Sequence, residues 1–215
     1  SLGVMGPSNL QVAGEPVRYE VTMEPSSRPW LMTLDATPRV PGGLSLAALL
    51  TPELQWVTDR PVTDITRYSA VAYPQFRYGP TSRAGVPPDY VQLPDGFNPR
   101  TRELAQQLRS DPRHAGGTPA LVQAALERLR TGGYVYTLQP GVYGQHTADE
   151  FWFDRKAGFC EHIASSFVVL MRAMGVPARI VTGYQGGERN PVDGFWTLRQ
   201  ADAHAWAEVW VDGNG

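Results

Sequence analysis

The sequence is short of cysteine, since Cys160 is the only one among 215 residues. A single thiol excludes an internal disulfide, and it excludes zinc clusters built from several thiolates. It does not determine the cellular compartment, because a single cysteine occurs both in cytosolic proteins and in periplasmic proteins that avoid incorrect disulfides. We expect no metal and no other cofactor.

Long apolar runs and basic segments are also missing. No run of about 18 apolar residues occurs, so nothing in this sequence is expected to span a membrane. The formal net charge is −2 with no basic cluster, which argues against nucleic acid as a partner. Ser1 opens no signal peptide. The missing start methionine and the end at VDGNG suggest a fragment of a longer protein, with its location encoded elsewhere.

Residues 1–80 show the pattern of β-strands. In PVRYEVTMEP, apolar and polar residues alternate from Val17 to Met23, the period of a half-buried strand. PWLMTLDATPRV (29–40) and DITRYSAVAYPQFRYG (64–79) are similar, with Pro and Gly between them. We predict a β-rich segment over 1–80, a small antiparallel sheet or partial sandwich, followed by a second domain over 81–215.

The period changes to helical from about residue 94. NPRTRELAQQLRSD and TPALVQAALERLRTGG each place a capping residue, Asn98 or Thr118, before a first-turn proline. A third helix is predicted to start near Cys160, with apolar residues at helical spacing as far as Met174. Gly175 fits the C′ position, where a left-handed residue ends a helix.

Strands are predicted to follow this helix. They are ARIVTGYQ (178–185), GFWTLRQ (194–200) and ADAHAWAEVWVD (201–212), with GGERNPVD (186–193) as a loop and DGNG (212–215) as a tight turn. Alternation in the last strand places His204, Trp206 and Glu208 on one face. A helix followed by antiparallel strands predicts an α+β fold.

Cys160 is a candidate nucleophile because of its place at a helix start. Free N–H groups and the positive end of the helix dipole favour thiolate over thiol there. Acyl transfer also needs an imidazole to accept and return a proton. His204 lies 44 residues downstream, on a strand predicted to pack beside that helix. The N–H of Cys160 could donate to a developing oxyanion.

Plainer interpretations compete with this one. A free cysteine is usually a buried packing residue, and a strand histidine is usually structural. His162 is a rival base, but i,i+2 positions on a helix diverge, which indicates a surface or supporting residue. His114 and His146 lie in loop-like surroundings. A metal site from Cys160, His162, His204 and a carboxylate lacks the usual ligand spacing.

The motifs resemble a known family. G-x-C-E-H, G-V-P-A-R, T-G-Y and D-A-H-A-W-x-E-V occur in this order between residues 150 and 215. This segment resembles the core of the transglutaminase-like superfamily, and within it the extracytoplasmic domain of bacterial membrane-anchored TgpA-type proteins. Residues 1–80 resemble the preceding β segment more loosely. The resemblance implies a papain/transglutaminase-like α+β fold, in which the nucleophile helix packs on an antiparallel sheet.

The resemblance also implies residue roles. Cys160 matches the nucleophile and His204 matches the base. The third member of the family's triad is an Asp, expected just beyond Gly215. Asp212 belongs to a turn that favours Asp for local reasons. Asp202 lies two residues before His204, so neither is assigned as the acid.

Supporting roles are expected for five further residues: Glu161, Trp152, Trp206, Glu208 and Tyr184. The glutamates could support the site or recognise a substrate amine, or could form structural ion pairs. The tryptophans could shield the thiolate or aid an oxyanion site, or could be core. Tyr184 could border the cleft.

The resemblance implies protein-glutamine γ-glutamyltransferase chemistry through a thioester on Cys160. The partners would be a protein or peptide with a glutamine-like carboxamide and an amine acceptor. Hydrolysis by a peptidase or amidase with the same dyad, and a non-catalytic extracytoplasmic binding module, stay open. The implied location is the periplasmic domain of an inner-membrane protein, with membrane segments outside this chain. The sequence does not predict an oligomeric state.

Overall fold

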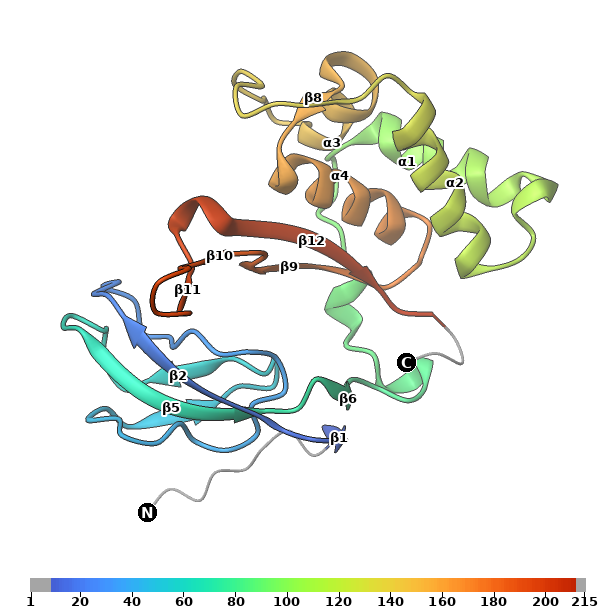
Figure 1. The fold of residues 1–215 in the computed structure, drawn as a ribbon. Helices are drawn as coiled ribbons and strands as arrows, with labels where there is room; N and C mark the ends of the chain where they lie inside the picture. Colours follow the sequence, from blue (N-terminus) through green and yellow to red (C-terminus); the bar gives the residue numbers. More distant parts are fainter. Residues whose placement is uncertain (1–8, 212–215) are drawn as a thin grey trace. The chain divides into compact units, whose positions relative to one another are not determined.

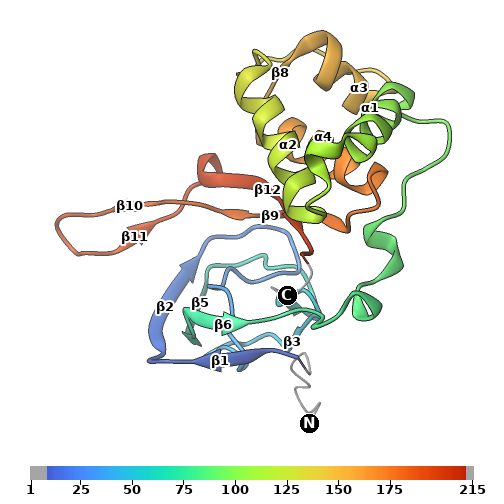
Figure 2. The same cartoon turned by 90° about the vertical axis from the view of Figure 1, so that its right-hand side faces the viewer.

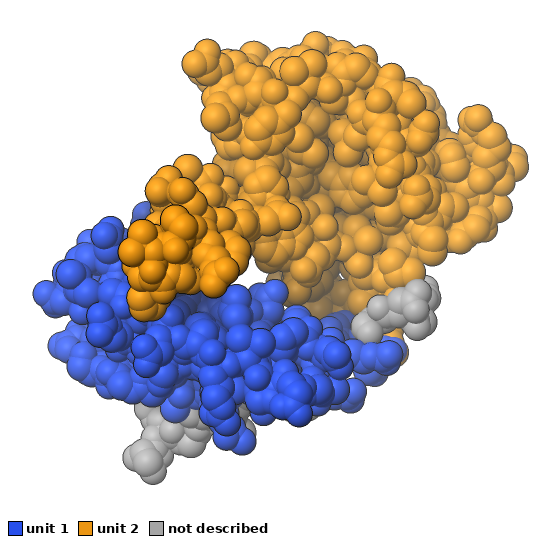
Figure 3. Space-filling view, in the orientation of Figure 1, with its two compact units in different colours: residues 1–81, 215 blue, residues 82–214 orange. Residues whose placement is uncertain are grey.

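The structure is a computed structural model that describes residues 9–211. Figures 1 and 2 draw the ribbon from two sides, and Figure 3 colours two compact units, residues 1–81 and 82–214. The turn predicted at DGNG, including Asp212, lies outside the described residues. No helix in the described range is both long and apolar enough to cross a bilayer.

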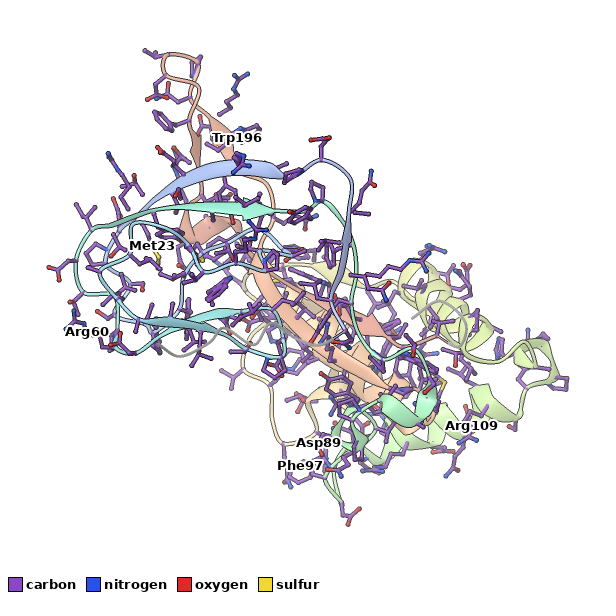
Figure 4. All side chains as sticks on the ribbon, turned by 90° about the horizontal axis from the view of Figure 1, so that it is seen from below. Met23, Arg60, Asp89, Phe97, Arg109 and Trp196 are labelled. Atoms are coloured by element: carbon purple, nitrogen blue, oxygen red, sulfur yellow. The ribbon has the colours of Figure 1, made fainter. Side chains whose placement is uncertain are left out.

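The first unit is built from antiparallel strand pairs. Its strands are β1 (Gln11–Ala13), β2 (Val17–Met23), β3 (Ala48–Leu50), β4 (Trp56–Thr58), β5 (Thr66–Ala72) and β6 (Gln75–Arg77). They pair as β1–β6, β2–β5 and β3–β4. Val21 and Met23 of β2 turn inward as their alternation predicts, and Met23 (labelled in Figure 4) packs with Trp56 and Tyr68 in the core.

Residues 29–40 do not form the predicted strand and contribute only an isolated bridge. Backbone groups and side chains of the neighbouring strands together satisfy this irregular segment. The hydroxyl of Tyr19 accepts from the N–H of Leu34 at 2.9 Å, and the indole N–H of Trp56 donates to the carbonyl of Thr37 at 2.8 Å. The apolar residues of this segment pack without the continuous backbone hydrogen bonds of a strand. Strand periodicity alone does not distinguish these two cases.

The second unit places helices on one side of a two-stranded sheet (Figures 1 and 2). The helices are α1 (Pro99–Ser110), α2 (Thr118–Thr131), α3 (Thr147–Asp149), a π-helix (Glu150–Arg155) and α4 (Cys160–Ala173). Short 3₁₀ turns cover Arg83–Gly85, Pro88–Tyr90, Pro112–His114 and Gln200–Asp202. The core lies where α1, α2, α3 and the π-helix surround α4, with Phe151, Trp152, Leu170 and Met171 almost fully buried.

The strands of this unit are β7 (Val135–Tyr136), β8 (Ala157–Gly158), β9 (Ala178–Tyr184), β10 (Glu188–Arg189), β11 (Trp196–Thr197) and β12 (Ala203–Val209). β9 pairs antiparallel with β12, and the short β7 and β8 pair in parallel. The predicted loop and the strand after it instead form a hairpin, β10–β11, which extends as an arm in Figure 2. The α+β prediction is confirmed.

Helix α4 begins and ends where the sequence predicts. Its first residue is Cys160, and Gly175 follows its end with φ +75°, the left-handed conformation expected at C′. The N–H of Val176 then reaches back to the carbonyl of Met171 at 2.9 Å.

Asn98 holds the predicted N-cap position of α1, before the first-turn proline, but its side chain makes no capping bond to its own helix and instead takes part in an exchange of caps between α1 and α3. Asn98 takes a left-handed conformation, and its side-chain oxygen accepts from the N–H groups of Ala148 and Asp149, at 3.0 and 3.3 Å. The buried carboxylate of Asp149 accepts in return from the N–H groups of Arg100 and Thr101, at 3.0 and 2.7 Å. Each side chain satisfies helix-end donors about fifty residues away.

The second predicted cap is displaced by one position. Thr118 is the first residue of α2, and Gly117 precedes the helix without a side-chain cap. Such shifts of one residue are common at helix ends.

Replacing Asp149 by alanine should lower the free energy of unfolding by about 3 kcal/mol, because buried N–H donors lose a charged acceptor. Asp154→Ala is the matched control, since its exposed ion pair with Arg100 (2.9 Å) should contribute less than about 1 kcal/mol. Urea unfolding of both variants measures the difference. Equal destabilisation would show that the reciprocal cap adds nothing beyond a surface pair.

Candidate active site

The segment that leads into Cys160 is held by three consecutive carbonyl groups. The carbonyl of Lys156 accepts from the N–H of Val135 at 2.8 Å, and that of Gly158 accepts from the N–H of Thr137 at 2.9 Å. Between them, the carbonyl of Ala157 accepts from the hydroxyl of Tyr143 at 2.6 Å. We call these three hydrogen bonds the 156–158 clamp, which fixes the backbone immediately before the candidate nucleophile.

The Tyr143 donor of the clamp and the neighbouring Lys156 make further contacts of their own. Burial raises the pKa of the Tyr143 hydroxyl, so it stays protonated and able to donate. The guanidinium of Arg155 lies over the Tyr143 ring at 5.0 Å and pairs with Glu150 at 3.0 Å. Lys156 adopts a left-handed conformation, φ +51°, and its ammonium donates to the carbonyl of Gly132 at 3.0 Å. Sequence patterns did not indicate this network.

Cys160 is the first residue of α4 and is half-buried. Phe159 precedes it in extended conformation, and no side chain caps the helix. The first-turn N–H groups are therefore left for a ligand or solvent at the positive end of the helix dipole. Glu161 is exposed and makes no ion pair with any described residue.

His204 is the second residue of β12 and pairs with Gly183 of β9. α4 and β12 pack together and run in the same direction, so both begin at the same end of the unit (Figure 1). Ala205 is buried toward the core, and alternation turns His204 to the other face of the strand. Within residues 9–211 neither the thiol nor the imidazole makes a hydrogen bond, so their direct contact stays a prediction.

Trp206, Glu208 and Arg179 form a linked group on the face that carries His204. The carboxylate of Glu208 pairs with Arg179 at 2.8 Å and accepts from the indole N–H of Trp206 at 3.4 Å. The Trp206 ring lies across Gly183, where an added Cβ would be 3.1 Å from it. An indole thus lies over the residue opposite His204, and the absent side chain at Gly183 makes room for it.

The remaining predicted residues are held by other partners. Trp152 is fully buried, and its indole N–H donates to the carbonyl of Ser166 at 3.0 Å. The hydroxyl of Tyr184 donates to Gln200 at 3.2 Å. The carboxylate of Asp202 accepts from the N–H of Arg199 at 2.7 Å, so it is engaged in a local turn.

The other three histidines contact residues other than His204. Nδ1 of His114 lies 3.1 Å from the carbonyl of Leu108, and that of His146 accepts from the N–H of Asn98 at 3.1 Å. His162 packs between aromatic rings on the first turn of α4. Among the described residues, no group of three or more His, Cys, Asp and Glu could hold a metal ion.

A cavity of about 200 Å³ opens beside β7. Its lining is almost wholly apolar and aromatic: Leu129, Tyr134, Val135, Tyr136, Phe151 and Ile163. Ile163 lies about one helical turn after Cys160, so the cavity adjoins the first turn of α4. Its lining comes from four separate segments, which a local pattern cannot bring together.

Two family models match this sequence. Residues 102–215 match the transglutaminase-like superfamily, and residues 2–78 match the TgpA N-terminal domain. A protein-glutamine gamma-glutamyltransferase of Pseudomonas aeruginosa is 38% identical over 95% of this chain. The chain spans 30% of that relative's length. An uncharacterized protein of Bacillus subtilis, YebA, is 32% identical over 59% of this chain and 18% of its own length.

Solved structures agree with these matches. The periplasmic domain of TgpA from Pseudomonas aeruginosa superposes with a TM-score of 0.81 at 36% identity, covering 96% of this chain and 69% of that one. The same domain bound to ethylmercury gives a TM-score of 0.79 at 36% identity, covering 96% and 72%.

Trp152→Phe should lower the free energy of unfolding by about 1–2 kcal/mol, because Ser166 loses a buried donor and the ring becomes smaller. The rate of Cys160 alkylation by iodoacetamide should not change, since the indole is part of the core. Trp196→Phe is the control, with a side chain 67% exposed and no expected effect on stability. Slower alkylation without lost stability would instead assign Trp152 to the reacting site.

Proposed function

Because the chain belongs to the transglutaminase-like superfamily, we propose that it is a cysteine-dependent acyltransferase with Cys160 as nucleophile and His204 as general base. The observation that carries the proposal is the single thiol of the chain at the uncapped start of α4, behind the 156–158 clamp. The strand that carries His204 packs along this helix and begins at the same end, so the two residues lie at the same end of the unit, with His204 on the strand face opposite Ala205.

The chemistry follows from these groups. The imidazole takes the thiol proton, and the thiolate attacks the carbon of a carboxamide. The backbone N–H of Cys160 donates to the oxyanion of the tetrahedral intermediate. The imidazolium returns its proton to the leaving nitrogen, the C–N bond breaks, and ammonia departs from a thioester. An amine then attacks the thioester carbon, gives its proton to the imidazole, and the thiolate leaves.

A third group has to orient the imidazole for this cycle. From the family resemblance, we propose that it is an Asp just beyond Gly215. Asp202 is not assigned this role, since its carboxylate accepts from the N–H of Arg199. Glu208 shares its strand face with His204, but it is paired with Arg179. It therefore supports the site through Trp206, whose ring lies over Gly183.

The proposed substrates are a protein or peptide with a glutamine-like carboxamide, and an amine or water as acceptor. The relative from Pseudomonas aeruginosa is named a protein-glutamine gamma-glutamyltransferase, which supports transfer to an amine. The likeness to a periplasmic domain supports action outside the cytoplasm, as part of a membrane-anchored protein.

Cys160→Ala should abolish incorporation of a fluorescent amine into a glutamine-containing peptide. His204→Ala should lower kcat/KM about a thousandfold, because no other group then strips the thiol proton. His114→Ala is the matched control and should keep the wild-type rate. Equal activity in Cys160→Ala and wild type would exclude the proposed mechanism.

The acceptor should decide between transfer and hydrolysis, since both use the same thioester. With saturating amine, the amide product should outnumber the hydrolysed peptide, measured by mass spectrometry while ammonia release is followed in parallel. Ammonia release that leaves only hydrolysed peptide would make the protein an amidase. Absence of both products with every peptide would favour a binding module.

A further inference from the structure

His162 is half-buried on the first turn of α4, between two aromatic rings. Its ring centroid lies 4.4 Å from that of Phe159, edge to face, and 4.7 Å from that of Tyr143. Nδ1 of His162 is buried and has no hydrogen-bond partner among the described residues. The ring therefore contributes shape and contact area at this position, and its Nδ1 contributes no hydrogen bond.

The backbone of Gly158 lies directly against this histidine. A Cβ added at Gly158 would lie 2.6 Å from the Cβ of His162 and 2.9 Å from its Cγ. The Cβ is fixed by the helix backbone and cannot move away, whereas the Cγ turns with the side chain. Position 158 thus accepts only glycine, and the His162 side chain packs directly on its backbone.

His162 therefore contacts residues 157–159, which lead into Cys160, either directly or through Tyr143. It contacts Gly158 and Phe159 itself, and it contacts Tyr143, whose hydroxyl binds the carbonyl of Ala157. Cys160 follows immediately along the chain. A shift of the His162 ring would remove one of the two sets of contacts that hold residues 157–159. The hydrogen bonds of the 156–158 clamp would remain.

We propose that His162 is a positioning residue, whose ring presses residues 157–159 against the 156–158 clamp and so fixes the thiol and the backbone N–H of Cys160. Its effect on turnover rests on the proposed function, whereas its effect on the backbone does not. The role differs from that of a general base, because side chains at i and i+2 diverge around a helix.

The test compares His162→Ala, which removes the ring, with His162→Phe, which keeps a ring without nitrogen, in the full chain. For His162→Ala we expect kcat to fall about 10- to 100-fold with KM changed less than about threefold, as for a misplaced reacting group. Alkylation of Cys160 should slow, and amide hydrogen exchange in residues 158–160 should rise about tenfold. His162→Phe should restore all three quantities toward wild type.

The controls separate this proposal from the proposed function. His114→Ala should match wild type in every measurement. His162→Leu replaces the alanine variant if circular dichroism shows that the latter does not fold. Hydrogen exchange and alkylation report the backbone and thiol even in the absence of enzyme activity, whereas the activity of Cys160→Ala decides the acyltransferase proposal alone.

Two outcomes would overturn the positioning role. One is wild-type exchange, alkylation and kcat in His162→Ala, which would make the ring dispensable. The other is equal loss of kcat in His162→Ala and His162→Phe with unchanged hydrogen exchange, which would assign the ring nitrogens a chemical role instead.

Discussion

Three consecutive hydrogen-bonded carbonyl groups, at Lys156, Ala157 and Gly158, are the constraint on which the candidate site depends. A backbone N–H stabilises an oxyanion best when it is fixed before the charge develops. Reorientation during the reaction would cost free energy and so reduce the stabilisation of the transition state. The clamp fixes the chain from one side and the first turn of α4 fixes it from the other. A flexible loop would carry the same thiol without this preorganisation.

The rest of the second unit supports this arrangement from a distance. The exchange of caps between Asn98 and Asp149 joins α1 to α3, and the π-helix follows directly. The buried Trp152 of that π-helix then binds the carbonyl of Ser166 on α4. Helix α4 is thus tied to the helical layer by this hydrogen bond as well as by apolar packing.

Local sequence patterns predicted the parts of the fold that local physics determines. The start and end of α4, the alternation in β12 and the resemblance to the transglutaminase-like superfamily are all confirmed. The prediction of a strand at residues 29–40 was wrong, because strand-like alternation also fits an irregular segment that is held by scattered backbone and side-chain hydrogen bonds. The clamp, the reciprocal caps and the place of His162 join residues distant in sequence, or depend on packing, and no periodicity reveals them. The pairing of Cys160 with His204 stays a prediction.

The most direct test of the proposed mechanism is detection of the thioester intermediate on Cys160. Mixing the protein with a glutamine-containing peptide in the absence of amine, followed by acid quenching and tandem mass spectrometry, detects it. The account predicts an adduct with the mass of the peptide less ammonia, attached to Cys160 and lost on adding hydroxylamine. Turnover of the peptide without this adduct, or with the adduct on another residue, would contradict it.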